Sequence, residues 1–211
     1  QALDELKTNQ SKCIVTLVNS IDDYKKWEEI CGKGRILPAF PGAGGGIQDD
    51  VLNGALTPWL VQPTTFAEIS GKKTARTMQL SKIFQKSHIP YQEVKDMHIW
   101  QLCHLAMVVP IADAYYETDN PENAGRDKKL MRKTAYRLKR NFRLLKKELG
   151  TLSPGKMNLF LFAPLPVLAT VLSAVYKSEF GNLFMYQHAI KAPDEMRQLH
   201  KQFYGYLKKV I

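Results

Sequence analysis

The chain has 211 residues, of which 45% are hydrophobic and 24% charged, and its formal net charge is +10. This composition is that of a folded globular chain of one large or two small domains, and it excludes an intrinsically disordered protein. Cys13, Cys31 and Cys103 are widely spaced without a C-x-x-C pattern, which argues against a disulfide framework and against a zinc or other metal site. We therefore expect a reducing, cytoplasmic setting.

The first third of the chain, from Cys13 to Ile69, consists of short apolar runs separated by turn residues. We predict a strand at "CIVTLVN" (13–19), a short helix at 21–31 and a second strand at "RILPAF" (35–40). Further strands are expected at "TPWLVQP" (57–63) and "TTFAEIS" (64–70), which are flanked by Pro and Gly. This alternation predicts an α/β segment.

A glycine cluster, "RILPAFPGAGGGI" (35–47), follows the second predicted strand directly. Glycine lets a backbone approach a ligand closely, so Gly42, Gly44, Gly45 and Gly46 suit a loop that faces a ligand phosphate. The spacing matches neither G-x-G-x-x-G nor G-x-x-x-x-G-K-[ST], so a flexible turn between two strands is the alternative.

The rest of the chain has helical periodicity. We predict helices at Thr74–Lys86, His98–Glu117, Arg126–Leu149, Met157–Tyr176 and Pro193–Lys209, with a short extended segment "IPYQEV" (89–94) after the first of them. Asp96 suits the N-cap of the second helix. Apart from that extended segment, this part of the chain is expected to be all α.

Residues 126–147 of the predicted helix 126–149 account for the whole charge imbalance of the chain. The apolar residues of this segment recur at helical spacing, which predicts one amphipathic helix with a solvated basic face. No recognition motif or aromatic platform accompanies the charge, so we do not expect a nucleic-acid partner, although an anionic surface is the alternative. Between residues 126 and 147 one acidic residue, Asp127, stands against eleven basic ones: Arg126, Lys128, Lys129, Arg132, Lys133, Arg137, Lys139, Arg140, Arg143, Lys146 and Lys147.

The segment Met157–Tyr176 is uncharged over twenty residues, which is long enough to cross a bilayer. Pro164 and Pro166 interrupt it, and no other segment of this kind is present. We therefore expect no membrane span, and expect the segment to be buried in a helical core or at a dimer interface.

Five parts of the chain together resemble the ketopantoate reductase (2-dehydropantoate 2-reductase) family. They are the strand that ends in Asn, "IVTLVN"; the strand that runs into a small-residue loop, "ILPAFPGAGGG"; a strand pair near "TTFAEIS"; the long helix opened by "DMHIWQLCHLAMVVPIADA"; and the closing "HAIKAPDEMRQLHKQFYGYL". The resemblance implies a partial Rossmann segment at 1–72 with an NADP-binding role. It also implies an all-α C-terminal domain at 73–211, similar to that of 6-phosphogluconate dehydrogenase, for substrate binding and dimerisation.

The same resemblance implies an NADP-dependent oxidoreductase that reduces a 2-keto acid or a related small-molecule carbonyl, and a homodimer. The G-x-G-x-x-G turn that opens such domains and holds the cofactor pyrophosphate does not occur in these residues. We therefore expect the first half of the Rossmann domain to precede Gln1, and this chain alone to bind NADPH weakly or not at all. The alternatives are a reductase-like protein without catalysis that binds a nucleotide or a partner, and an unrelated helical binding protein.

By the resemblance, Asn19 contacts cofactor and substrate, and Asn120 matches a substrate-binding asparagine. The cofactor-facing loop corresponds to Gly42, Ala43, Gly44 and Gly45, and the acidic residue near the last third has a loose counterpart in Glu179.

The proton-donating lysine of the family is absent from this chain. Its place is taken by Leu102, or by Gln101 if the helix is aligned on Pro110, and neither side chain is a general acid. His104 could take over the acid role because imidazole titrates near neutrality. The alternative is that His104 is an interior structural histidine and His98 a surface one.

Overall fold

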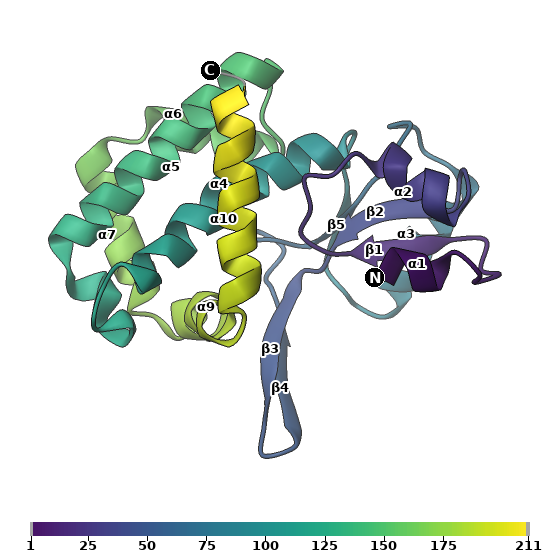
Figure 1. Cartoon of the computed structure of the whole chain (residues 1–211). Helices are drawn as coiled ribbons and strands as arrows, with labels where there is room; N and C mark the ends of the chain where they lie inside the picture. Colours follow the sequence, from purple (N-terminus) through teal and green to yellow (C-terminus); the bar gives the residue numbers. More distant parts are fainter. Residues whose placement is uncertain (1, 210–211) are drawn as a thin grey trace. The chain divides into compact units, whose positions relative to one another are not determined.

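The computed structural model describes residues 2–209, apart from the side chains of Ala2 and Gln48, and shows a mixed α/β chain with a helical C-terminal region (Figure 1). The chain forms two compact units. The first holds the residues up to Ala43 together with Ala55–Gln101, and the second holds Gly44–Gly54 and the residues from Leu102 onward. Apart from Gly44–Gly54, the boundary lies at 101/102 and not at the expected 72/73, because residues 91–93 form a strand of the sheet in the first unit.

The first unit is built on a four-stranded mixed sheet. Its strands are β1 (Ile14–Leu17), β2 (Ile36–Phe40), β5 (Thr64–Phe66) and β6 (Tyr91–Glu93), in the order β1-β2-β5-β6. β1 and β2 are parallel, as are β5 and β6, whereas β2 and β5 are antiparallel. The predicted strands at 13–19, 35–40 and 64–70 and the extended segment at 89–94 are therefore confirmed.

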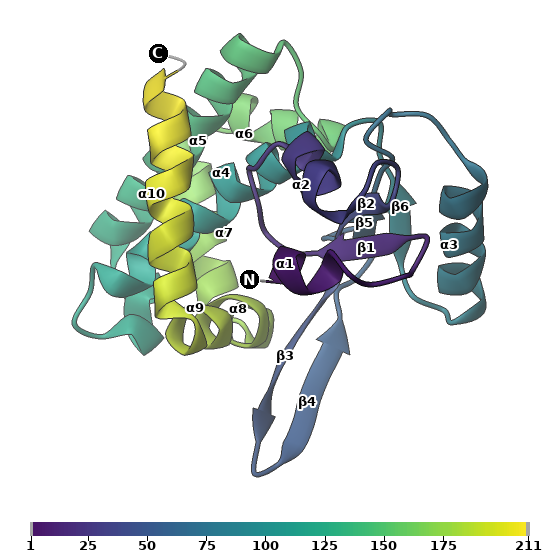
Figure 2. The ribbon, with the colours of Figure 1, turned by 45° about the vertical axis from the view of Figure 1, so that its right-hand side comes forward.

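Helices connect the two parallel pairs of strands (Figure 2). α2 (Tyr24–Cys31) joins β1 to β2, and α3 (Ala75–Lys86) joins β5 to β6, while the short α1 (Ala2–Leu6) precedes β1. Both connecting helices have N-caps that satisfy their first backbone N–H groups: Asp23 accepts from the N–H of Lys25, and Thr74 forms a reciprocal capping box with Thr77. One hydrophobic cluster of this unit consists of Ile14, Tyr24, Trp27, Cys31, Ile36, Ala67, Met97 and Trp100.

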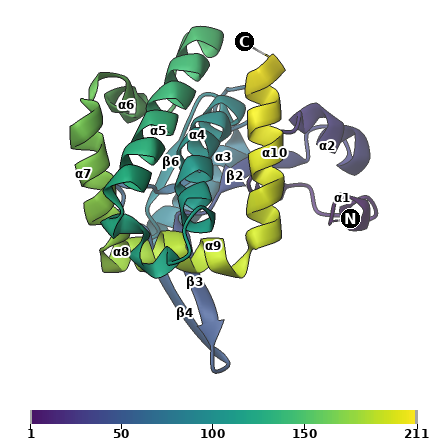
Figure 3. The same ribbon diagram turned by 60° about the vertical axis from the view of Figure 1, so that its left-hand side comes forward.

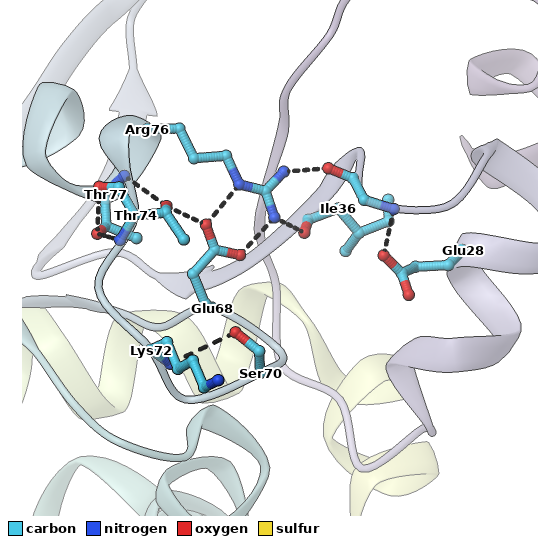
Figure 4. A network of polar contacts seen from close by, with 9 residues as sticks. Glu28, Ile36, Glu68, Ser70, Lys72, Thr74, Arg76 and Thr77 are labelled. Atoms are coloured by element: carbon cyan, nitrogen blue, oxygen red, sulfur yellow. Dashed lines mark hydrogen bonds and ion pairs between the residues drawn. The ribbon is translucent and has the colours of Figure 1, made fainter.

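A buried ion pair fixes α3 to the start of β2 (Figure 4). The Arg76 guanidinium donates to both carboxylate oxygens of Glu68 (2.6 and 2.5 Å) and to the carbonyls of Gly34 (2.5 Å) and Ile36 (2.9 Å). The hydroxyl of Thr74 also donates to Glu68. Glu68 is 7% exposed, and its hydrogen bonds from Arg76 hold the pKa of its carboxyl below the usual value.

The glycine cluster is a strand and not a loop. β3 (Ala43–Gln48) pairs with β4 (Val51–Leu56) in a two-stranded sheet, closed by Asp49 and Asp50, which both have positive φ (50° and 60°). Two positive φ values match the type I′ turn of a two-residue hairpin. The strand predicted at 57–63 is also wrong: the N–H groups of Val61 and Gln62 donate to the Pro58 carbonyl, which forms a turn.

The second unit is helical (Figure 3). α4 (Met97–Tyr116) begins in the first unit and continues into this one, and α5 (Lys128–Leu149) and α7 (Leu165–Tyr176) pack along each other. The elements that complete it are η1 (Pro121–Arg126), η2 (Gly155–Asn158), α6 (Leu159–Phe162), α8 (Glu179–Gly181), η3 (Asn182–Tyr186), α9 (Gln187–Lys191) and α10 (Pro193–Lys209).

α5 confirms the predicted amphipathic helix. Asp127 caps its N-terminus by accepting from the N–H of Leu130, and Gly150 ends it in the left-handed conformation (φ 68°). The apolar side of the helix is buried, including Leu138, Phe142 and Leu145, and most of its basic residues are exposed. The excess of positive charge in the chain therefore lies mostly on the exposed side of this helix.

The predicted single helix 157–176 is broken into η2, α6 and α7. Ala163 ends α6 with ψ 129°, because the residue before a proline is disfavoured in the helical region, and Pro164 precedes the first turn of α7. Among residues 2–209, no helix combines the length and apolarity that a membrane crossing requires.

Candidate functional site

At the carboxyl end of β1, in the first unit, the side chain of Gln101 holds a turn by two hydrogen bonds. The N–H of Ser20 donates to Oε1 of Gln101 (2.6 Å), and Nε2 of Gln101 donates to the carbonyl of Val18 (2.9 Å). Gln101 is 1% exposed; its bond from Ser20 is buried, whereas its bond to Val18 is part-buried. The first turns of α4 thus hold the two residues on either side of Asn19.

Asn19 itself lies between these two anchored residues and is half-buried. Its Oδ1 is buried and accepts no hydrogen bond from the described part of the chain. A buried amide oxygen that gains no partner is costly, so this atom is suited to accept a hydrogen bond from a ligand. The position also fits the rule that open α/β sheets bind ligands at the carboxyl ends of their strands.

Gln101 and Leu102 differ sharply in their surroundings. Gln101 faces the backbone at the end of β1, whereas Leu102 is completely buried in the second unit. Of the two alternative places for the missing lysine, only 101 lies against the turn that carries Asn19. Its amide is neutral and already engaged at both ends, so it offers no proton for general acid catalysis.

Two glycines of the predicted cofactor loop, Gly42 and Gly44, are closely packed against other parts of the protein. A side chain on Gly42 would collide with the backbone of Thr64 and one on Gly44 with the ring of Phe184, whereas one on Gly46 would meet the flexible ammonium end of Lys191. Gly42 is further fixed because its N–H donates to Oγ1 of Thr64 (2.9 Å) and its carbonyl accepts from Thr57 (2.8 Å). Protein atoms therefore fill the space in front of Gly42 and Gly44.

His104, Glu179 and Asn120 lie in three different elements of the second unit. His104 is on α4 and 5% exposed; burial, with a further contribution from nearby His188, lowers the pKa of its imidazole to about 3. At neutral pH it is therefore uncharged, which disfavours the acid role. Glu179 is exposed at the start of α8, and Asn120 is exposed before η1, where its Oδ1 accepts from Asn123 (3.1 Å).

Sequence reasoning missed a hollow of about 400 Å³ in the first unit, at the N-termini of α2 and α4. Asp23 and Asp96 line it and cap the two helices, and the bond from the N–H of Ile99 to Asp96 (2.9 Å) confirms the predicted N-cap. Tyr24 also lines the hollow, and burial raises the pKa of its phenol. The carboxylates here are engaged in helix capping, which is a structural role.

A histidine–aspartate pair in the second unit was also not predicted from the sequence. Nδ1 of His200 on α10 is 2.7 Å from Oδ1 of Asp113 on α4, and burial raises the pKa of the Asp113 carboxyl against the lowering effect of His200. Asp113 is 9% exposed and His200 is half-buried. An aspartate within the apolar run "VVPIADAYY" was the only sequence signal for this pair.

Comparison with known proteins adds no family: no protein-family model matches the sequence, and no curated protein or solved structure matches it either.

Proposed function

We propose that this chain is part of an NADP-dependent oxidoreductase of the ketopantoate reductase type. In this proposal the first unit is the later half of a Rossmann-like domain, and the second is a helical domain similar to that of 6-phosphogluconate dehydrogenase. The β1-α2-β2 unit, whose first strand ends at an asparagine turn, supports this reading because it is a parallel mononucleotide-type unit.

The observation that carries the proposal is the buried Oδ1 of Asn19 at the carboxyl end of β1. An amide oxygen accepts a hydrogen bond from the carboxamide or ribose hydroxyl of a nicotinamide nucleotide, and Gln101 keeps the turn in place for that purpose. Bound NADPH would supply the hydride. The packed glycines fit the cofactor less well, so we assign the nucleotide contact to Asn19 and not to β3.

Reduction of ketopantoate needs a group that donates a proton to the carbonyl oxygen, and this chain has no suitable donor at the expected positions. Gln101 and Leu102 are not acids, and the neutral imidazole of His104 is a poor proton donor at pH 7. Because a general acid contributes a factor of about 10² to 10⁴ in rate, ketopantoate should be a poor substrate. This favours a different carbonyl substrate or, as the second candidate function, a reductase-like protein that binds a nucleotide without reducing anything.

Backbone NMR of the chain, titrated with reduced nicotinamide mononucleotide, tests the nucleotide site. This probe lacks the second phosphate and the adenosine, so it does not require the missing pyrophosphate turn. We expect shift changes concentrated at residues 18–20 and 101, lost in Asn19→Ala and retained in Asn182→Ala, whose asparagine is exposed in the other unit. Unchanged signals at 18–20, or equal changes in both variants, would refute the site.

Consumption of NADPH by the full-length gene product separates the two candidate functions. A panel of 2-keto acids and aldehydes is offered as substrate. Turnover of any member supports a reductase, whereas nucleotide binding without turnover supports the binding protein.

A further inference from the structure

The β3–β4 hairpin exposes a complete strand. All six residues of β4 are exposed, and the side chains of Ile47, Val51 and Leu52 near the turn are 69%, 59% and 74% exposed. Figures 1 to 3 draw the hairpin as a separate two-stranded ribbon. Because successive side chains of a strand point to opposite faces, Val51 and Leu52 expose an apolar side chain on each face of the ribbon, and exposed apolar surface of this kind marks an interaction site.

One strand of the hairpin is anchored and the other is not. On β3, Gly44 lies against Phe184 and Gly46 against Lys191, so this strand packs on η3 and α9. Among the hydrogen bonds of the described residues, none reaches Val51–Leu56 from outside the hairpin. The outer edge of β4 therefore presents unpaired N–H and C=O groups, and an isolated two-stranded hairpin is at best marginally stable in water.

The charge distribution favours a second copy of this chain as the partner. Residues 36–67 contain no Lys or Arg, and their only charges are Asp49 and Asp50, in a chain with a net charge of +10. Two copies of such a chain repel each other least where they meet through this stretch. The exposed apolar residues of α7, such as Val167 and Val171, are less suitable for self-association because α7 packs beside the basic helix α5.

We propose that β4 is a homodimer interface, at which the β4 strands of two copies pair antiparallel and join the two hairpins into one four-stranded sheet. Such a contact is isologous, because the same edge is used by both copies. In the register centred between Asn53 and Gly54, Val51 lies opposite Leu56 and Leu52 opposite Ala55, so no charged residues of β4 face each other. The pairing satisfies the N–H and C=O groups of the open edge, and it brings Val51 and Leu52 beside Leu56 and Ala55 of the second copy as cross-strand neighbours.

Sedimentation velocity over a range of concentrations tests the proposal on the full chain. We expect a monomer–dimer equilibrium whose dissociation constant rises about tenfold or more in Leu52→Lys, because this change puts a charge at the paired edge. Val171→Lys is the matched control, an exposed apolar residue on α7 changed in the same way, and it should leave the equilibrium unchanged.

Amide hydrogen exchange gives a second readout that does not depend on either variant. Exchange at residues 51–56 should slow as the concentration of the wild-type chain rises, while exchange in α7 stays constant. A monomer at every concentration overturns the proposal, and so does a dimer that Val171→Lys dissociates and Leu52→Lys does not. A monomer whose 51–56 amides become protected only on adding an extended peptide would assign the edge to a different partner and equally overturn it.

Discussion

Truncation of Gln101 tests whether the turn at the end of β1 is held as described. Gln101→Ala removes the acceptor for the Ser20 N–H and the donor to the Val18 carbonyl. Ser20 is 6% exposed, so its N–H would be left buried without a partner, whereas Val18 is 48% exposed and its carbonyl can bond water instead. The two ends of the amide therefore contribute unequally to stability.

The expected loss of stability follows from the burial of the Ser20 N–H and the exposure of Val18. An unsatisfied buried N–H costs about 1–3 kcal/mol, and each buried methylene removed from the side chain costs about 0.8 kcal/mol. We therefore expect Gln101→Ala to lower the free energy of unfolding by about 2–4 kcal/mol. Gln101→Met keeps the length of the side chain but loses both hydrogen bonds, so its cost should be closer to about 1–3 kcal/mol.

Urea unfolding followed by circular dichroism measures these differences, with Gln79→Ala as the control on an exposed position of α3. The control should change stability by less than about 0.5 kcal/mol. If both Gln101 variants also fall within about 0.5 kcal/mol of the wild type, the two hydrogen bonds of Gln101 do not stabilise the turn at the end of β1.

Three further perturbations address other parts of the chain. Arg76→Met should cost about 3–5 kcal/mol, because it leaves the buried Glu68 carboxylate without its ion-pair partner and with only the Thr74 hydroxyl as a side-chain donor. Since the pKa of Glu68 is lowered in the folded state, this cost should shrink as the pH falls below 4.5. A cost independent of pH in urea unfolding would contradict the pairing. Reversing the charges of Lys129, Arg132 and Arg143, which are exposed on α5, should change the free energy of unfolding by less than about 0.5 kcal/mol. If the wild type binds RNA or DNA in a salt-sensitive way and this variant does not, the basic side of α5 is a binding surface and not merely a solvated face. The pKa of His104 is about 3 in the folded protein and 6.5 in an exposed imidazole, so the protein should become less stable as the pH falls below 6.5. His104→Gln should remove this dependence of the melting temperature on pH. An unchanged dependence would show that another group causes it.

Elements with local signals were predictable from the sequence. Thr74 caps α3, Asp127 and Gly150 bound α5, and Pro193 begins α10, so each of these helices could be placed from capping residues and apolar spacing. The strands β1 and β2 were predictable for a similar reason, since each is a short apolar run between turn residues. These signals depend only on residues close in the sequence.

The hairpin was missed because its local signals point elsewhere. Glycine is depleted in strands, so "GAGGG" favours a loop, and the Asp49–Asp50 turn lacks the Asn-Gly or Asp-Gly pair that usually marks a two-residue hairpin. β3 is a strand because it pairs with β4, and its Gly44 also lies against Phe184, more than 130 residues later. The pairs Ser20–Gln101 and Asp113–His200 are likewise 81 and 87 residues apart, and such partners cannot be paired from one sequence.

Neither position available for the missing lysine would readily accept one. At 101 an ammonium could donate to the Val18 carbonyl but could not accept from Ser20, because lysine has three donors and no acceptor. At 102 the side chain is fully buried, so a lysine there would lose its charge or disrupt the core. We therefore expect that neither Gln101→Lys nor Leu102→Lys gives the full-length gene product NADPH-dependent ketopantoate reduction, and that both lower the free energy of unfolding. A gain of activity in a stable Leu102→Lys protein would show instead that this side chain reaches the reacting carbonyl and that the assignment of Gln101 to the site is wrong.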